Sequence, residues 1–205
     1  MFKDQKEYWE ARYRSGRNSG CGSVDENRKW KWNIIESTLD HRIISVIDYG
    51  CGDLSFWKLS FWKRKECIDY IGIDVSLHQL AINRKSRPTW KFVEATDIES
   101  VEPRPVVLCM DVLFHIIPED DYLKVIENLI KLSTDYIFIH TWINNPFKHL
   151  NRISDGKYQI FREFDKYFPI FNDHGFKLQS IIENPIDHIG ALYIFRKDSE
   201  LPTSK

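Results

Sequence analysis

The sequence has almost no net charge, few cysteines and no long apolar run. Its 205 residues carry 29 Lys and Arg against 30 Asp and Glu, so the formal net charge is −1. This balance disfavours a dedicated nucleic-acid-binding protein. The four cysteines include no Cys-x-x-Cys pair, so we expect reduced thiols in a cytoplasmic protein. No apolar run approaches the roughly 20 residues of a membrane span, so we expect no membrane association.

The remaining composition is that of an ordinary folded protein. Hydrophobic residues make up 42% of the chain and charged residues 29%, which is typical of a globular domain and not of a disordered chain. The first 14 residues carry charges throughout, so we expect no signal peptide. The length suits one domain that buries most of its apolar surface.

Short apolar runs alternate with segments of helical periodicity. The runs predict strands at 43–47, 69–73, 90–93, 106–110 and 136–139. The helical segments are 2–14, 26–39, 54–65, 76–84, 118–132 and 161–173. Alternation of this kind predicts parallel β-α-β units. Two final strands, 176–182 and 191–195, are joined by a short loop, which permits only antiparallel pairing.

The most informative segment is VIDYGCGD at residues 46–53. It places the carboxylate of Asp48 at the end of an apolar strand and follows it with the turn Gly50-Cys51-Gly52. Glycine lets a ligand approach the backbone closely because it has no Cβ. The next predicted strand ends in a second carboxylate, Asp74. A glycine turn after one strand and an acid after the next is the layout that binds a nucleoside across a parallel sheet.

Four segments together resemble the class I S-adenosylmethionine-dependent methyltransferases. They are VIDYGCG at 46–52, YIGIDVS at 70–76, VEATDI at 93–98 and CMDVLFHI at 109–116, in the family's order. The resemblance implies an α/β, Rossmann-like fold with a seven-stranded, mostly parallel sheet, a C-terminal antiparallel hairpin and N-terminal helices as a lid. It also implies S-adenosylmethionine as cofactor. We therefore expect one domain over 1–205, with a lid at 1–40, a core at 41–197 and a tail at 198–205.

The resemblance also implies roles for individual residues at the cofactor. Asp48 and the turn Gly50-Cys51-Gly52 would hold the methionine end, and Asp74 would accept hydrogen bonds from the ribose hydroxyls. The adenine would lie near the three residues Val75, Asp97 and Ile98. Trp9 and Tyr13 match a lid helix that is found in many members, and aromatic faces attract a sulfonium cation.

Asp111 and His115 follow the fourth strand, at the sheet edge where ligands of open α/β folds bind. Asp111 is a candidate for both cofactor binding and catalysis. His115 is a candidate general base because its reference pKa lies near neutrality; the alternative is that it only holds its loop by hydrogen bonds. A further alternative, Mg²⁺ held by Asp111 with Asn144 and Asn145, is weaker, and we predict no metal.

The implied reaction is in-line displacement of the cofactor's methyl group by an acceptor atom. We predict a small-molecule or sugar-like acceptor, contacted from the segments 1–32 and 141–165 by residues such as Trp142, His149, Arg152 and Tyr158. A protein side chain is the alternative acceptor, and a non-catalytic cofactor-binding module is a further alternative. A nicotinamide dehydrogenase fits poorly, because Ser55 stands where the third glycine of its fingerprint would be.

Overall fold

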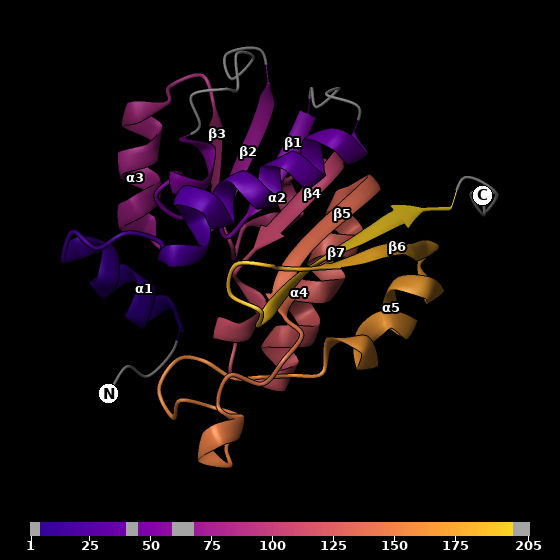
Figure 1. Ribbon diagram of the computed structural model, residues 1–205. Helices are drawn as coiled ribbons and strands as arrows, with labels where there is room; N and C mark the ends of the chain where they lie inside the picture. The colour runs from indigo at the N-terminus through magenta and orange to yellow at the C-terminus, as the bar shows by residue number, and fades with distance from the viewer. Residues whose placement is uncertain (1–4, 40–44, 59–67, 199–205) are drawn as a thin grey trace.

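The computed structural model describes residues 5–39, 45–58 and 68–198 (Figure 1). Its centre is one seven-stranded sheet in the order β3-β2-β1-β4-β5-β7-β6. The strands are β1 Ser45–Tyr49, β2 Asp69–Asp74, β3 Lys91–Glu94, β4 Arg104–Met110, β5 Ser133–Trp142, β6 Phe176–Glu183 and β7 Gly190–Lys197. The first five run parallel, and β7 lies antiparallel between β5 and β6. This confirms the predicted fold class, including the closing hairpin.

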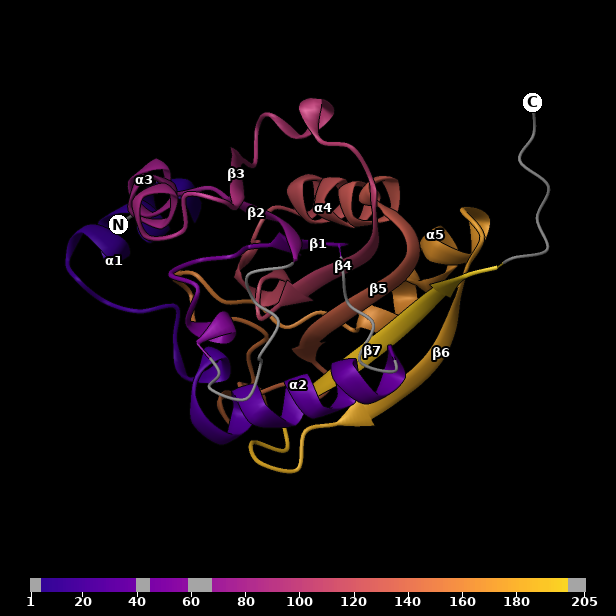
Figure 2. The ribbon, with the colours of Figure 1, turned by 90° about the horizontal axis from the view of Figure 1, so that it is seen from above.

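Helices cover both faces of the sheet, which explains why its central strands are apolar on both sides (Figure 2). One core contains side chains of α4 (Glu119–Leu132) and α5 (Phe168–Asp173), including Ile126 and Phe171. The opposite core contains side chains of α2 (Asp25–Thr38) and α3 (Leu77–Ser86), including Trp32 and Leu80. The remaining helix, α1 (Gln5–Arg14), lies beside α3 at the carboxyl ends of the strands.

Several predicted elements are shorter than the sequence suggested. Of the predicted helix 54–65, the described part holds only a 3₁₀ turn, η2 (Ser55–Trp57), and 59–65 lie outside the described residues. Leu54 has a φ of 60°, a left-handed conformation that cannot belong to a helix. The predicted helix 161–173 begins instead with the 3₁₀ turn η7 (Phe164–Tyr167) and continues as α5, with Pro169 in its first turn.

The two N-terminal helices differ in position. We expected both within the lid at 1–40, but α2 packs on the sheet. Trp32 is fully buried, stacks on Phe56 and donates a hydrogen bond from Nε1 to the carbonyl of that residue at 2.7 Å. The apolar face of α2 therefore packs into the core, whereas α1 lies at the carboxyl ends of the strands.

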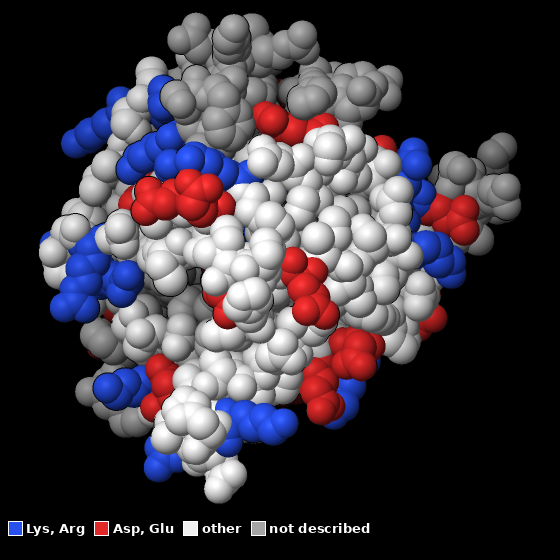
Figure 3. All heavy atoms as spheres, in the orientation of Figure 1, with Lys and Arg blue, Asp and Glu red and all other residues white. Residues whose placement is uncertain are grey.

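Charge is mixed over the surface, as the net charge predicts. On the face in Figure 3, Lys and Arg side chains are interspersed with Asp and Glu and form no single field. Within the described ranges, no helix is long and apolar enough to cross a bilayer.

Candidate active site

The glycine turn after β1 has the backbone conformation that its sequence suggests. Gly50 and Gly52 have φ of 81° and 51°, in the left-handed region. The backbone N–H groups of Gly50 and Cys51 donate to the carbonyl of Ile73 at 2.7 and 3.0 Å, which ties the turn to the end of β2. A Cβ on Gly50 would stand 2.2 Å from Cγ2 of Val112. Both conformation and space therefore require glycine here.

Asp74 lies at the end of β2, where it holds this turn. It also lines a cavity beneath α1. Its Oδ2 accepts a hydrogen bond from the Gly52 N–H at 2.8 Å, and its Oδ1 accepts one from the Ser76 N–H at 2.9 Å. Burial raises the pKa of Asp74 above its ordinary value. Two bonds leave free lone pairs on the carboxylate, so Asp74 can also accept hydrogen bonds from a ligand.

Asp48 faces away from that cavity. Its carboxylate is buried and accepts hydrogen bonds from Trp57 Nε1 at 2.7 Å and from the Tyr70 hydroxyl at 2.9 Å. Burial raises the pKa of Asp48 to about 6. The sequence grouped Asp48 with Asp74, but the structure brings only Asp74 to the cavity wall. A direct role for Asp48 at a ligand stays a prediction.

The raised pKa of Asp48 gives an expected pH dependence of stability. Its folded pKa of about 6 exceeds the ordinary value of 3.8 for an aspartate, so between these pH values the native state binds more protons and wild-type stability falls as pH rises. The Asp48→Asn variant has no carboxylate to titrate at this position, so its stability should not fall in this way. We expect it to increase the free energy of unfolding by roughly 1–2 kcal/mol above pH 6 and hardly at all below pH 4. Urea titrations at pH 4, 6 and 8 measure this.

The matched control for this measurement is Asp135→Asn, which changes a partly exposed carboxylate near the start of β5 that pairs with Arg196. It should leave the unfolding free energy within about 0.5 kcal/mol of wild type at every pH. A loss of stability in Asp48→Asn that is equally large at pH 4 and pH 8 would contradict the assignment.

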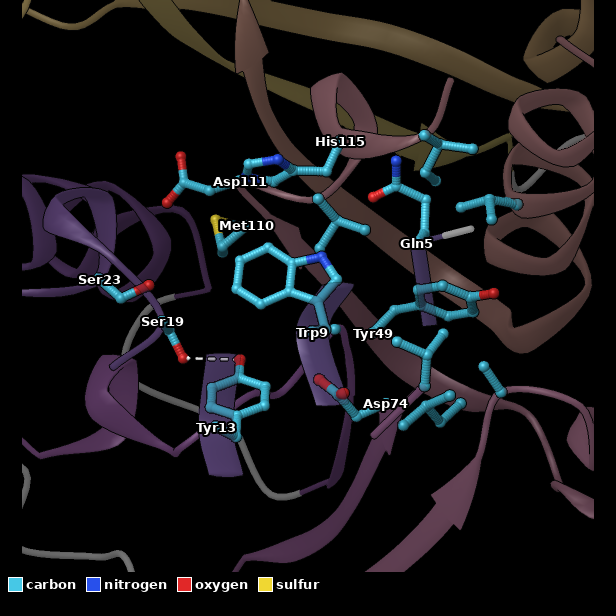
Figure 4. Close-up of a pocket in the computed structure, with 17 residues that line it drawn as sticks. Gln5, Trp9, Tyr13, Ser19, Ser23, Tyr49, Asp74, Met110, Asp111 and His115 are labelled. Carbon is cyan, nitrogen blue, oxygen red and sulfur yellow. Dashed lines mark hydrogen bonds between the residues drawn. The ribbon is translucent and has the colours of Figure 1, made fainter. Parts of the chain in front are cut away.

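The cavity lies between α1 and the carboxyl ends of β1, β2 and β4 (Figure 4). The Trp9 indole reaches into its centre, with Tyr13 on one side and Gln5 on the other. The lining residues are Gln5, Trp9, Tyr13, Ser19, Ser23, Tyr49, Gly50, Ile73, Asp74, Val75, Ala95, Met110, Asp111, Val112, His115, Ile116 and Val125. Seven predicted site residues are among them: Trp9, Tyr13, Gly50, Asp74, Val75, Asp111 and His115.

Polar contacts hold α1 over this cavity. Glu10 accepts a hydrogen bond from the Ser76 hydroxyl at 2.6 Å, and Lys6 forms an ion pair with Glu94 at the end of β3. The Tyr13 hydroxyl lies 3.2 Å from Ser19 Oγ. Burial raises the pKa of Tyr13, so its hydroxyl stays protonated. The first helix therefore forms one wall of the cavity, and Trp9 and Tyr13 both line it. Their role as a lid over a cofactor stays a prediction.

Asp111 is held by charged and polar neighbours at the end of β4. Lys31 Nζ donates to its Oδ2 at 2.5 Å, and His140 Nδ1 lies 2.6 Å from its Oδ1. Burial alone would raise the pKa of Asp111, but Lys31 and His140 outweigh burial and hold the pKa far below its usual range. Asp111 is therefore a permanent carboxylate at neutral pH, which makes it a hydrogen-bond acceptor and a poor general base.

His115 has a defined tautomer. Its Nδ1 lies 3.1 Å from the backbone carbonyl of Tyr158. A carbonyl only accepts, so Nδ1 carries the hydrogen and Nε2 carries the lone pair in the neutral ring. Burial lowers the pKa of His115 to about 4, so the ring is neutral at pH 7. Nδ1 of His115 therefore holds a loop, which was the alternative weighed for this residue. Nε2 carries a lone pair, but the lowered pKa makes it a weaker base than an exposed imidazole, and the general-base role stays a prediction.

A second cavity adjoins the first and shares Trp9, Ser19, Asp111 and His115 with it. Its walls are largely aromatic: Phe114 stacks on Trp142 with ring centroids 4.2 Å apart, and Tyr8 stacks on Tyr158 at the same distance. Its other lining residues are Arg12, Gly20, Cys21, Gly22, Asn27, His140, Gln159 and Asp187. The predicted acceptor contacts Trp142 and Tyr158 lie here, whereas His149 is exposed and Arg152 lines a separate hollow.

Besides Asp48, four predicted cofactor residues do not line the first cavity. Cys51 is buried, and Gly52 acts through its N–H bond to Asp74. Ile98 belongs to the core and Asp97 is exposed. Their predicted contacts with the cofactor stay predictions. Two lining residues outside the four motifs, Gln5 and Val125, carry no sequence signal that distinguishes them from surface and core positions.

The structure does not favour the magnesium alternative. The Asp111 carboxylate already contacts the Lys31 ammonium, and the amides of Asn144 and Asn145 bind the carbonyls of His188 and Arg152. In the part of the chain that the structure describes, no three His, Cys, Asp or Glu residues cluster as metal ligands.

No family model and no curated protein matches this sequence. Solved structures do match. A magnesium protoporphyrin IX methyltransferase from Synechocystis PCC 6803 with bound S-adenosylhomocysteine is 17% identical, with a TM-score of 0.67 over 94% of this chain and 98% of that one. The N-methyltransferase NodS from Bradyrhizobium japonicum WM9, also with that ligand, is 13% identical, with a TM-score of 0.66 over 95% and 99%.

A third similar structure is a 1,6-didemethyltoxoflavin-N1-methyltransferase from Burkholderia thailandensis. It is 16% identical, with a TM-score of 0.66 over 94% of this chain and 87% of that one, and was crystallised with 1,6-didemethyltoxoflavin and S-adenosylhomocysteine. At these identities the comparisons establish the fold. The chain has the class I methyltransferase fold along nearly all of its length.

Proposed function

We propose that this chain, which has the class I methyltransferase fold, transfers a methyl group from S-adenosylmethionine to a small molecule. The observation that supports this most is the cavity beneath α1, where the glycine turn, the Asp74 carboxylate and the Trp9 indole meet at the carboxyl ends of the strands. Ligands of open α/β sheets bind at this edge. Similar structures hold S-adenosylhomocysteine or S-adenosylmethionine.

The residues present fit the chemistry of this cofactor. Asp74 offers free lone pairs to the ribose hydroxyls, and Gly50 lines the cavity without a side chain that would obstruct the methionine end. The permanent carboxylate of Asp111 suits an ammonium group. Val75 and Ala95 supply apolar surface for the adenine. When bound, the cofactor supplies a methyl group on a sulfonium, an activated leaving group.

The protein's own contribution is alignment, exclusion of water and proton transfer. The walls formed by α1 and the second cavity's aromatic side chains hold two reactants together, which alone can contribute several kcal/mol. Trp9 and His115 lie in the walls of both cavities. Nε2 of His115 is placed to take the proton of an acceptor hydroxyl or amine as the methyl group is transferred.

The second cavity favours a small acceptor over a protein side chain. Its stacked aromatic walls suit a molecule with an apolar face. Small acceptors are named for two similar structures, a porphyrin and a toxoflavin precursor. Sugar-like metabolites, which also stack on aromatic rings, remain within this proposal.

The acceptor class is tested by radiolabel transfer. The full chain is incubated with S-adenosylmethionine that is tritiated in its methyl group, together with a cell extract divided into a small-molecule and a protein fraction. We expect label in the small-molecule fraction. Label confined to protein would favour the side-chain alternative, and no label in either fraction would favour a cofactor-binding module without catalysis.

Trp9 should distinguish the charged cofactor from its uncharged product. An aromatic face near the sulfonium contributes about 1 kcal/mol of cation–π attraction, which S-adenosylhomocysteine lacks. We expect Trp9→Leu to weaken S-adenosylmethionine binding about fivefold more than S-adenosylhomocysteine binding. Trp9→Phe, which keeps an aromatic face, should retain most of the difference. Equal weakening of both ligands by Trp9→Leu, measured by calorimetry, would assign Trp9 to packing alone.

A further inference from the structure

Lys31 is a lysine without solvent contact that lies beside Asp111, a residue in the walls of both cavities. Its side chain on α2 is fully buried. Besides Asp111, its Nζ binds only the carbonyl of Gly22, at 3.0 Å, among the interactions of the described residues. Burying an ammonium is costly unless it is paired and hydrogen-bonded. Packing alone needs no charge here, so the ion pair calls for a role beyond core filling.

His140 binds the opposite oxygen of the same carboxylate. The ionised carboxylate of Asp111 only accepts, so His140 Nδ1 carries the hydrogen. Burial and the nearby Lys31 lower the pKa of His140, so the ring is neutral. The backbone adds a third link, because the Asp111 N–H donates to the His140 carbonyl at 3.1 Å. Asp111 is thus fixed from both sides.

Two glycines leave room for this arrangement. A Cβ on Gly22 would stand 2.3 Å from Asp111 Oδ2, and a Cβ on Gly190 would stand 2.6 Å from His140 Nε2. Neither glycine has a positive φ, so backbone conformation does not require glycine at these positions. Both positions require glycine because a side chain has no room there. Asp111 itself has a φ of 62°, a conformation that costs a non-glycine residue roughly 1 kcal/mol or more. A strained residue held by two buried partners is typical of a functional site.

We propose that Lys31 and His140 are positioning residues that aim the Asp111 carboxylate at the junction of the two cavities, where it accepts a hydrogen bond from a hydroxyl or amine of the acceptor. Lys31 and His140 occupy one lone pair on each oxygen, and Asp111 lines both cavities. The inference rests on the proposed function and adds the acceptor's chemistry. A carboxylate or phosphate as the attacking group would face a like charge.

The probe is sinefungin, a cofactor analogue that carries an amine where the methyl-bearing sulfonium stands, compared with S-adenosylhomocysteine, which has neither group. If Asp111 acts at the junction of the two cavities as proposed, an amine in that place can donate a hydrogen bond to its carboxylate. We expect wild type to bind sinefungin at least about tenfold more tightly. Asp111→Asn should abolish this preference, so that the dissociation constants of the two ligands become equal even where the substitution weakens both. General damage to the site would weaken both ligands equally and leave their ratio of dissociation constants unchanged.

His140 provides a matched pair of variants. His140→Leu removes the N–H group that donates a hydrogen bond to Asp111. This substitution should reduce the sinefungin preference at least threefold. His140→Asn can still donate an amide N–H to Asp111 and should keep most of the preference. Equal preference in wild type, His140→Leu and His140→Asn would overturn the positioning role.

Lys31→Met adds a pH signature. Without Lys31, burial should raise the pKa of Asp111, so the sinefungin preference should be present at pH 8 and reduced at pH 5. In wild type the preference should be constant over this range. The other titratable groups that act on Asp111 or His140 are His115, Cys109 and Asp187; His115, with a pKa of about 4, stays neutral here.

The outcomes separate the two proposals. If wild type binds S-adenosylhomocysteine but shows no sinefungin preference, or if Lys31→Met leaves a preference that is independent of pH, the positioning inference is overturned and the methyltransferase proposal stands. If wild type does not bind S-adenosylhomocysteine, the proposed function itself fails. If Lys31→Met does not fold, the His140 pair decides.

Discussion

Replacing Asp74 with alanine should weaken S-adenosylhomocysteine binding at least tenfold and on the order of a hundredfold. Two hydrogen bonds from ribose hydroxyls to a carboxylate together contribute about 3 kcal/mol, and each 1.4 kcal/mol is a factor of ten in affinity. The substitution also frees the Gly52 N–H that Asp74 binds, which loosens the glycine turn. Isothermal titration calorimetry measures the change.

Asp69→Ala is the matched control for this prediction. It removes a carboxylate from the opposite end of β2, where Asp69 pairs with Arg104 at 2.7 Å. The control should bind S-adenosylhomocysteine with wild-type affinity. If Asp74→Ala binds as tightly as Asp69→Ala, the cofactor does not depend on this carboxylate, and the cavity beneath α1 loses its main polar anchor.

His115→Asn should lower the rate of methyl transfer to the labelled small-molecule fraction by about a hundredfold or more. Positioned general bases contribute roughly a hundredfold to ten-thousandfold. An asparagine amide can still donate to the Tyr158 carbonyl in place of Nδ1, but it has no basic Nε2. The substitution therefore separates proton transfer from loop holding, and initial rates at saturating cofactor measure it.

The pH dependence supplies an independent check on His115. Its pKa of about 4 keeps Nε2 unprotonated above pH 5, so the wild-type rate should show no loss attributable to His115 between pH 8 and pH 5. Protonation would lower the rate only as the pH falls through about 4. A His115→Asn enzyme with near wild-type rate and affinity would leave His115 with the loop-holding role alone.

The fold was predictable because its signals are local and repeated. Each buried strand is a short apolar run. The predicted helix 76–84 begins where Ser76 caps α3, with its Oγ accepting from the Gln79 N–H at 3.2 Å. The segment after Leu54 was not predictable from periodicity, since the left-handed φ of that residue prevents a helix and leaves no periodic signal in the sequence. The carbonyl of Phe56 is bound by Trp32, a residue 24 positions earlier.

Site residues were predictable where a sequence motif determines the backbone conformation. They were not predictable where contacts with other parts of the chain determine the direction of a side chain. Gly50 and Asp74 lie where the nucleoside-binding layout indicated. Asp48 stands in the same motif, but the distant residues Trp57 and Tyr70 bind its carboxylate inside the core.

Lys31 is a further residue whose position at the site could not be predicted from the sequence. In the sequence it is one charge in a polar helix, and only its contact with Asp111, 80 residues later, reveals a buried ion pair. His140 likewise follows the predicted strand 136–139 with no sequence signal of its own, and only the parallel pairing of β4 and β5 brings it beside Asp111. Charge pairs between distant segments leave no periodic signal in a single sequence.

Binding of S-adenosylhomocysteine to the full chain tests the central claim most directly. Calorimetric titration at pH 7.5 should show one site per chain, with no heat of binding for NAD under the same conditions, because the chain lacks the third glycine of the dinucleotide turn and has Ser55 there. Saturable binding of NAD with no binding of S-adenosylhomocysteine would contradict the account.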